Sequence, residues 1–415
     1  MAALRCVRWL GAGAAWVLAG CELTEVTVAP GEPVVVVHSV INRSRSDQFV
    51  VVEYSLTGSA ETPARSPSVP PGSPRLPIRG ALVTIQQLEG SPCAGRVDTL
   101  LESSDPDSAP GVYSGSVCAM VPGSALRLRV VTPAGEEVTG TTRIPEVVSR
   151  EVRVQDRLAR FALDTLDLNR DRDTIFVSVT ANRSRVVHVE ARQISHTSPH
   201  DPDLFLFTDT TRLRIAGRLY NPFQEEAVFL AGRYYAFTVA VGDTNYYDYL
   251  RSRSDPFTGR GYINRLKGGI GVFGAVDVAS YVLRVVADWK DQREGVYRIT
   301  GNVAGSEVDL EAELYLNDRR TGVASAFLRG QWIDGFLDAS ASGTMGGPGD
   351  NPNQLNLGLV TRSPSGGPST LFQFHGVRSD DGSPFPVELR VLSESGSEFR
   401  AELTMVQLRF PAGQP

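Results

Sequence analysis

The alternation of apolar and polar residues in the last third of the chain restricts its fold more than any other feature. Apolar or small residues occupy every second position from Tyr297 to Val303 and again from Val308 to Leu316, and polar residues fill most positions between them. A period of two puts one set of side chains on each face of a β-strand, whereas a helix needs a period near 3.6. This region is therefore predicted to consist of strands.

The same period continues towards the C-terminus. It recurs in Ala326–Trp332, Leu337–Ala341, Leu355–Leu359, Phe372–Gly376, Val387–Val391 and Phe399–Met405. About eight antiparallel strands therefore fill residues 290–410, as a small up-and-down barrel or a two-sheet sandwich. Small lining residues are compatible with either a ligand cavity or a tightly packed interior. Membrane barrels alternate as well, but these segments lack the strand length and aromatic girdles that membrane barrels need.

The first two thirds of the chain also show short strand-like segments separated by turn signals. β-Branched runs such as Val34–Val37 suit buried strands. A chain of 415 residues is too long for one compact core. We therefore predict an all-β fold in which two consecutive β-sandwich-like domains, residues 21–146 and 147–285, precede the meander.

Two local features interrupt these strands. Residues 57–80 are rich in proline, which cannot pair within a sheet, so they are expected to form a long loop in the first domain. A short helix is predicted near residues 245–252, with Asp243 or Thr244 as its N-cap.

Residues 1–20 have the three parts of an export signal. Arg5 and Arg8 give a positive start, Trp9–Ala19 form an apolar core, and small residues precede a cut directly before Cys21. The core has about eleven residues, against the roughly 20 that a membrane-spanning helix needs. We expect this segment to be removed.

Leu18, Ala19, Gly20 and Cys21 resemble the bacterial lipobox. The resemblance implies that Cys21 becomes the acylated N-terminus, and two or more acyl chains anchor a protein stably in a membrane. The alternative is an ordinary signal peptide that happens to precede a cysteine. Glu22 stands where lipoproteins of the inner membrane typically carry Asp, so the outer membrane is the expected location. Two orientations are compatible with the sequence, one facing the periplasm and one facing the cell exterior.

Net charge bears on the possible partners of the protein, and cysteine content bears on its covalent cross-links. The net charge of −6 argues against nucleic acid as a partner, since such proteins need a basic surface. Cys6 leaves with the signal and Cys21 serves as the anchor, so Cys93 and Cys118 remain. An even pair in an oxidising compartment favours a disulfide, worth roughly 3 kcal/mol for a loop of this size. Two buried free thiols are the alternative.

Two groups of residues are weak candidates for metal sites. Asp167, Asn169 and Asp171 place oxygen atoms at alternate positions, as a calcium loop does, but the glycine and glutamate that such a loop needs are absent. His196 and His200 lie close in sequence, although nearby prolines exclude a helix that would bring them together. A solvated turn and an exposed loop are the preferred interpretations. No metal and no cofactor are predicted.

Tyr246, Tyr247 and Tyr249 form the densest aromatic cluster of the sequence. Tyrosine-rich surfaces bind partners and sugars, but such side chains also fill the space between two sheets. Both interpretations stay open. The motifs of serine hydrolases and zinc proteases are absent from the sequence.

Several stretches resemble known families. Gly80–Ile85, Pro110–Tyr113 and Leu128–Gly135 resemble the transthyretin-like or carboxypeptidase-regulatory β-sandwich. Tyr246–Ser252 followed by Gly268–Ala275 is similar to a family of Gram-negative lipoproteins catalogued as domain of unknown function 4249. That resemblance implies a β-rich lipoprotein, and family members are often described beside TonB-dependent outer-membrane transporters. It implies no catalytic residues.

These observations predict an envelope-anchored lipoprotein that acts in binding, or as an accessory to a TonB-dependent outer-membrane transporter, without catalysis. One alternative is a surface hydrolase whose site is assembled from His, Asp and Glu side chains at strand ends. A purely structural envelope component is a third possibility.

Overall fold

The structure is a computed structural model, and it describes residues 33–55, 76–103, 110–182, 184, 186–194, 203–221, 226–253, 263–333, 335–346, 351–361, 370–379, 381, 383–393 and 398–409. Leu18–Cys21 and most of the proline-rich stretch lie outside the described residues. The described part consists of strands and a single helix, which confirms the predicted all-β class. Among these residues, no helix is both long and apolar enough to cross a bilayer.

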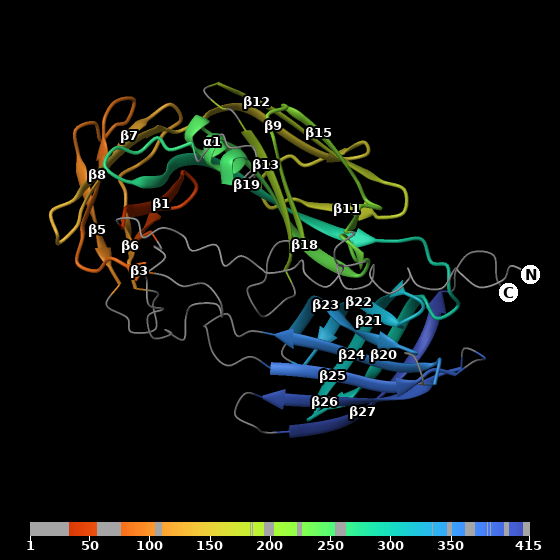
Figure 1. Cartoon of the computed structure of the whole chain (residues 1–415). Coiled ribbons are helices and arrows are strands. Elements are labelled where there is room, and N and C mark those ends of the chain that lie inside the picture. Colours follow the sequence, from red (N-terminus) through yellow and green to blue (C-terminus); the bar gives the residue numbers. More distant parts are fainter. Residues whose placement is uncertain are drawn as a thin grey trace, which may run out of the picture.

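The first unit is a sheet that curls around one apolar core (Figure 1). Its strands are β1 (Val35–Asn42), β2 (Asp47–Tyr54), β3 (Leu76–Pro77), β4 (Leu82–Gln87), β5 (Val97–Glu102), β6 (Val112–Ser116), β7 (Ala125–Val131) and β8 (Glu137–Arg143). They follow the order β1-β2-β6-β5-β4-β7-β8. The last strand of this order, β8, also contacts the segment just before Ile270. Thr139 on β8 and Lys267 in that segment exchange two backbone hydrogen bonds of 3.0 and 2.8 Å.

The second unit packs two sheets face to face over a second apolar core. Its elements are β9 (Glu146–Val154), β10 (Arg157–Leu158), β11 (Thr165–Asn169), β12 (Thr174–Asn182), β13 (Val186–Gln193), β14 (Leu204–Thr208), β15 (Arg212–Ala216), β16 (Tyr220–Asn221), β17 (Glu226–Ala227), β18 (Arg233–Gly242), α1 (Thr244–Arg253) and β19 (Ile270–Val286). One sheet has the order β10-β9-β12-β15, and the other contains β14, β13, β18 and β19.

Strand β19 belongs to both units. Its first half pairs in parallel with β1, and its second half pairs antiparallel with β18 and in parallel with β11. One face of β19 therefore contributes to both cores. Phe273, in its first half, lies in the first core, and Tyr281 and Leu283, in its second half, lie in the second. The division of this region into two domains stays a prediction, because one 17-residue strand is common to both cores.

The C-terminal unit is a closed barrel, and this confirms one of the two predicted arrangements. Its strands are β20 (Gly295–Val303), β21 (Ser306–Asp318), β22 (Val323–Trp332), β23 (Gly335–Met345), β24 (Gln354–Thr361), β25 (Thr370–Val377), β26 (Phe385–Ser393) and β27 (Glu398–Arg409). The apolar face points inward and forms one continuous buried cluster. Ion pairs such as Arg298–Asp309, at 2.6 Å, lie on the outside.

The barrel docks beneath the second unit (Figure 1). The ring of Phe327, on β22, lies 4.8 Å from the ring of Tyr234 on β18. The guanidinium of Arg284 on β19 lies 4.4 Å from the centre of the Phe327 ring. Arg284 also pairs with Glu313 of the barrel, and the Tyr234 hydroxyl donates a 2.8 Å hydrogen bond to Asp338. Buried aromatic contacts and ion pairs thus join the barrel to the ends of β18 and β19.

Candidate functional site

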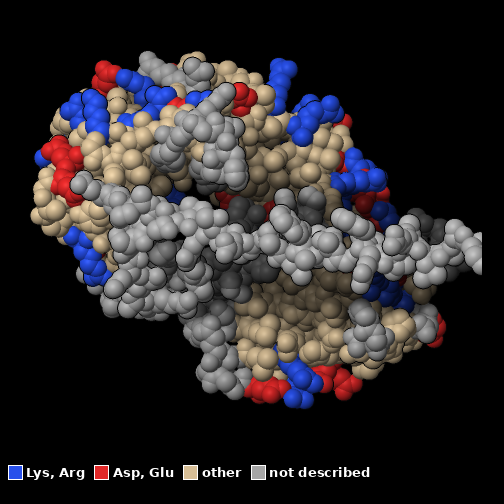
Figure 2. Space-filling model, in the orientation of Figure 1, with Lys and Arg blue, Asp and Glu red and all other residues tan. Residues whose placement is uncertain are grey.

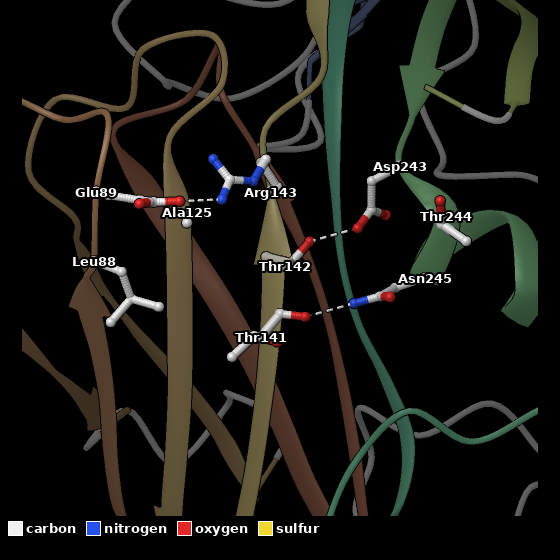
Figure 3. Close-up of a pocket in the computed structure, with 9 residues that line it drawn as sticks. All are labelled: Leu88, Glu89, Ala125, Thr141, Thr142, Arg143, Asp243, Thr244 and Asn245. Carbon is white, nitrogen blue, oxygen red and sulfur yellow. Dashed lines mark hydrogen bonds and ion pairs between the residues drawn. The ribbon is translucent and has the colours of Figure 1, made fainter. Parts of the chain in front are cut away.

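A hollow of about 740 Å³ with polar and apolar lining lies where β8 of the first unit meets the start of α1 (Figure 3). We call it the α1 pocket. It is lined by Leu88, Glu89, Ala125, Thr141, Thr142, Arg143, Asp243, Thr244 and Asn245. Residues from β8 and from the segment between β18 and α1 face one another across it, so two units of the fold contribute to one site.

Asp243 organises the wall of the pocket formed by α1. It is the N-cap of the helix, since its Oδ1 accepts a 2.9 Å hydrogen bond from the Tyr246 amide. The other carboxylate oxygen accepts a 2.7 Å bond from the hydroxyl of Thr142 on β8. Burial raises the pKa of the Asp243 carboxyl, while the bonds from Thr142 and from backbone amides act in the opposite direction. The predicted helix near 245–252 is thus α1, and its cap is tied to the first unit.

The side-chain amide of Asn245 strengthens the same junction. Its Nδ2 donates to the Thr141 carbonyl at 2.7 Å and to the Phe273 carbonyl at 2.8 Å. These bonds connect α1 to β8 and to β19, so the wall of the pocket is fixed by three elements.

The charged groups of the pocket lie at its opposite side. Arg143 on β8 pairs with Glu89, and its other terminal nitrogen donates to the Gly123 carbonyl at 2.9 Å. Both side chains are partly or largely exposed, at 36% and 68%. A hollow bordered by hydroxyls, an amide and an exposed ion pair can recognise polar groups through hydrogen bonds. Its described lining contains no His, Cys or Ser side chain.

The three candidate tyrosines lie on α1 and point to different neighbours. The Tyr246 hydroxyl lies 3.4 Å from Nδ1 of His188 on β13. The ring of Tyr249 makes an edge contact with His38 on β1, at 5.8 Å between ring centres. Tyr247 stacks under the guanidinium of Arg251 on its own helix, at 5.2 Å. All three rings are half-buried. Tyr246 and Tyr249 hold α1 against β13 and β1, whereas Tyr247 contacts only its own helix in these interactions, so the three do not form one aromatic surface.

The acidic turn after β11 binds cations of the protein itself. Asp167 lies 3.1 Å from Arg157, and Asp171 lies 2.8 Å from Nζ of Lys290. Burial works against ionisation of Asp171, but the bonds from Lys290 and the Asp288 amide lower its pKa overall. The side-chain oxygen of Asn169 accepts the Asp171 amide at 3.0 Å, which is the pattern of an Asx turn. Within the described residues, no group of three or more His, Cys, Asp and Glu side chains is placed to hold a metal ion.

The remaining candidates separate into two groups. Cys93 and Cys118 form the predicted disulfide, which ties the β4–β5 connection to the segment after β6. Cys21, His196 and His200 lie outside the described residues, so lipidation and a histidine site stay predictions.

One functional feature escaped the sequence analysis. The polar wall of the α1 pocket depends on Thr141, Thr142 and Arg143, a strand end with no recognisable motif. Only the N-cap signal at Asp243 points to this region in the sequence.

Comparison with known proteins gives one match. A protein-family model described as "Domain of unknown function (DUF4249)" matches residues 23–281. The match ends inside β19, so it covers both sandwich units and leaves the barrel outside. No curated protein matches the chain.

Proposed function

The chain belongs to the DUF4249 family, and from this premise we propose that it is a lipid-anchored binding protein of the outer membrane, accessory to a TonB-dependent transporter. The anchor would be Cys21, at the end of Leu18–Cys21. The α1 pocket is the observation that carries the binding role, because it is an open hollow of mixed polar and apolar lining built by two units that β19 holds together.

The arrangement of the pocket favours recognition over catalysis. The Asp243 carboxylate is occupied by Thr142 and by backbone amides, and Arg143 is neutralised by Glu89. A general base needs a free lone pair within reach of the proton that it removes. A partner loop or a sugar, by contrast, needs polar groups at the rim of the hollow, and the exposed Glu89–Arg143 pair supplies them.

The hydrolase alternative has less support in the described residues. His188 lies 3.9 Å from Glu190 beside the Tyr246 ring, and Nδ1 of His375 donates a 2.7 Å hydrogen bond to the side-chain oxygen of Asn356 on the barrel wall. Neither histidine lines the α1 pocket. His188 lies among structural contacts on β13, whereas His375 lines a separate hollow of about 420 Å³ on the barrel wall with Glu388, Arg400 and Glu402. Glu388 in that hollow is paired with Arg390 and Arg400, so it is not free to act as a general base.

The anchor is tested by mass spectrometry of the mature protein and by membrane fractionation. Wild-type protein should carry acyl chains on Cys21 and partition with the outer membrane, and Cys21→Ser should be released into the soluble fraction. An unmodified N-terminus, or a Cys21→Ser protein that still fractionates with the membrane, would contradict the proposal.

The binding role is tested by recovering the acylated protein from detergent-solubilised envelopes. We expect a TonB-dependent transporter to copurify with wild type, and the double variant Glu89→Ala/Arg143→Ala to lose it. The matched control is Arg129→Ala/Glu137→Ala, which removes another exposed Arg–Glu pair, at 3.0 Å, from the same unit but outside the pocket. Recovery of no transporter, or equal loss in both double variants, would refute the role of the pocket.

A further inference from the structure

The outer face of the four-stranded sheet carries a row of alternating arginine and apolar side chains. Reading across β10, β9, β12 and β15, the residues opposite one another are Leu158, Arg153, Phe176 and Arg214. The Phe176 ring stands between two guanidinium groups, whose carbons lie 4.6 Å and 5.2 Å from the ring centre. Each contact of this type adds a modest attraction and holds the arginine flat beside the ring.

The next row adds a third arginine and a hydroxyl. Arg212 on β15 lies opposite Ser178, and Ser178 lies opposite Glu151 on β9. The two rows line a shallow depression of about 540 Å³. Arg153, Arg212 and Arg214 are exposed, and no ion pair joins any of them to a carboxylate of the described residues. Glu151 and Asp156 are the carboxylates of the depression, so the arginines outnumber them.

The chain next to this row projects apolar side chains into solvent. Leu158 is 50% exposed, and the loop that follows it exposes Phe161 by 72% and Leu163 by 71%. Two residues lie between Leu158 and Phe161, so at most about 10 Å of chain connects them. Arg160, also exposed, lies within the same loop. Single exposed apolar residues are common on protein surfaces, but three within six residues form a local apolar patch of the kind that marks contact sites.

The fold holds this loop in place despite a backbone cost. The Asp164 carboxylate accepts bonds of 2.6 and 3.0 Å from the amides of Arg160 and Phe161, and the Leu163 amide donates to the Ser280 carbonyl at 2.7 Å. Leu163 adopts φ of 71°, a left-handed conformation that a leucine disfavours. A braced, strained loop that exposes two large apolar residues is therefore presented to something outside the fold.

From these observations we infer that this corner of the second unit rests on an anionic lipid surface. We call it the β10 corner, and it consists of Arg153, Leu158, Phe161, Leu163, Phe176, Arg212 and Arg214. Guanidinium groups match phosphates, and the apolar loop matches the boundary between headgroups and acyl chains. A soluble phosphate would satisfy the arginines but would leave Phe161 and Leu163 in water. Figure 2 shows Lys and Arg atoms along the upper margin of the molecule, over the region where Figure 1 places β9, β12 and β15.

The inference rests on the proposed anchorage, since the acyl chains of Cys21 would bring the β10 corner to the membrane. Its test therefore uses the full chain with Cys21→Ser, which cannot be acylated. Binding is measured by flotation with vesicles of phosphatidylglycerol and, separately, of phosphatidylcholine. We expect binding to phosphatidylglycerol that weakens with salt. Failure of acylation in the wild type would leave this result untouched, so the two proposals can fail independently.

Two variants separate the parts of the β10 corner. Arg153→Gln/Arg214→Gln should weaken binding about 25-fold, because each cation near an anionic surface contributes roughly five-fold. Phe161→Ser/Leu163→Ser should weaken it at least about ten-fold through lost apolar burial. Matched controls are Arg127→Gln and Leu101→Ser, exposed residues on strands of the first unit, and they should change binding less than about two-fold.

A third variant distinguishes a binding role from a structural one. Leu163→Gly removes the side chain and suits the left-handed backbone, so it should leave the melting temperature unchanged or higher while vesicle binding falls. Vesicle binding that is absent, that is unaffected by both double variants, or that depends on the arginines alone and is abolished by inorganic phosphate would overturn the inference. The last of these outcomes would indicate a site for a free anion.

Discussion

Asp277 offers the sharpest test of how the two sandwich units are joined. It lies on the core-facing side of β19, between Phe273 of the first core and Tyr281 of the second, and its side chain is 2% exposed. Arg150 reaches it from β9 at 2.6 Å, and Arg43 reaches it from the end of β1. One carboxylate thus connects a strand of each unit to the strand that both share.

The expected cost of Asp277→Asn follows from what each arginine loses. Arg150 is 10% exposed and would lose its charged partner, keeping its 2.9 Å bond to the carbonyl of residue 277 and at most a neutral bond to the new amide oxygen. Arg43 is 36% exposed and can turn to water. Removing one partner of a buried pair costs 3–5 kcal/mol in general, so we expect about 3 kcal/mol here, most of it from Arg150. For a body of this size that corresponds to a melting temperature lower by about 6–12 °C.

Hydrogen exchange followed by mass spectrometry measures this effect in each unit separately. Since β19 completes both cores, Asp277→Asn should increase exchange in both sandwich units and leave the barrel interior largely protected. Asp309→Asn, which breaks the exposed pair with Arg298, is the control and should cost less than about 1 kcal/mol. Adding Arg150→Met to Asp277→Asn should recover part of the loss. A change below about 0.5 kcal/mol, or faster exchange in the second unit alone, would refute the reasoning.

Three further predictions concern other parts of the fold. Replacing Cys93 and Cys118 with Ala should destabilise the first unit by about 3.5 kcal/mol, the loop-closure value for a separation of 25 residues, and thermal melting with and without reductant would show no difference if this were wrong. Burial raises the pKa of Asp243 in the folded state, so the stability gained from its protonated form is lost as pH rises through that pKa. Asp243→Asn should therefore gain melting temperature relative to wild type as pH rises above about 4, the pKa of a free Asp side chain, and a constant difference would contradict this. Gly271→Ala should abolish the pairing of β1 with β19, since φ is 128° and a Cβ would overlap the Val37 carbonyl oxygen, whereas Gly135→Ala, in an open turn, should cost only about 1 kcal/mol; equal protease resistance of the two variants would disprove the difference.

Local patterns predicted most of the elements because the forces behind them are local. Alternation located the strands of the barrel, and an N-cap aspartate located α1. The disulfide followed from cysteine count and compartment. The strands and the helix were predicted from patterns of a few neighbouring residues, and the disulfide from the two remaining cysteines. None of these predictions required knowledge of distant contacts.

Long-range pairing could not be predicted in the same way. β1 and β19 lie side by side in parallel although more than two hundred residues separate Val36 from its partner Ile270. Both faces of β19 are mostly apolar, so its period does not show that Asp277 faces the cores. The α1 pocket depends on the same pairing, because β19 brings the start of α1 against Thr142. A site built from two units is therefore invisible until their shared strand is placed.

The position of β18 connects the pocket to the barrel. Its first residues contact the barrel through Tyr234 and Asp338, and its last residue, Gly242, precedes Asp243 in the α1 pocket. Ten extended residues span about 34 Å. Both edges of this strand are paired, with β13 and with β19, so it has no second arrangement to adopt. Coupling between distant sites requires an element with two states. We therefore expect β18 to act as a rigid connection between the barrel and the α1 pocket, which fixes their separation without coupling them through a switch.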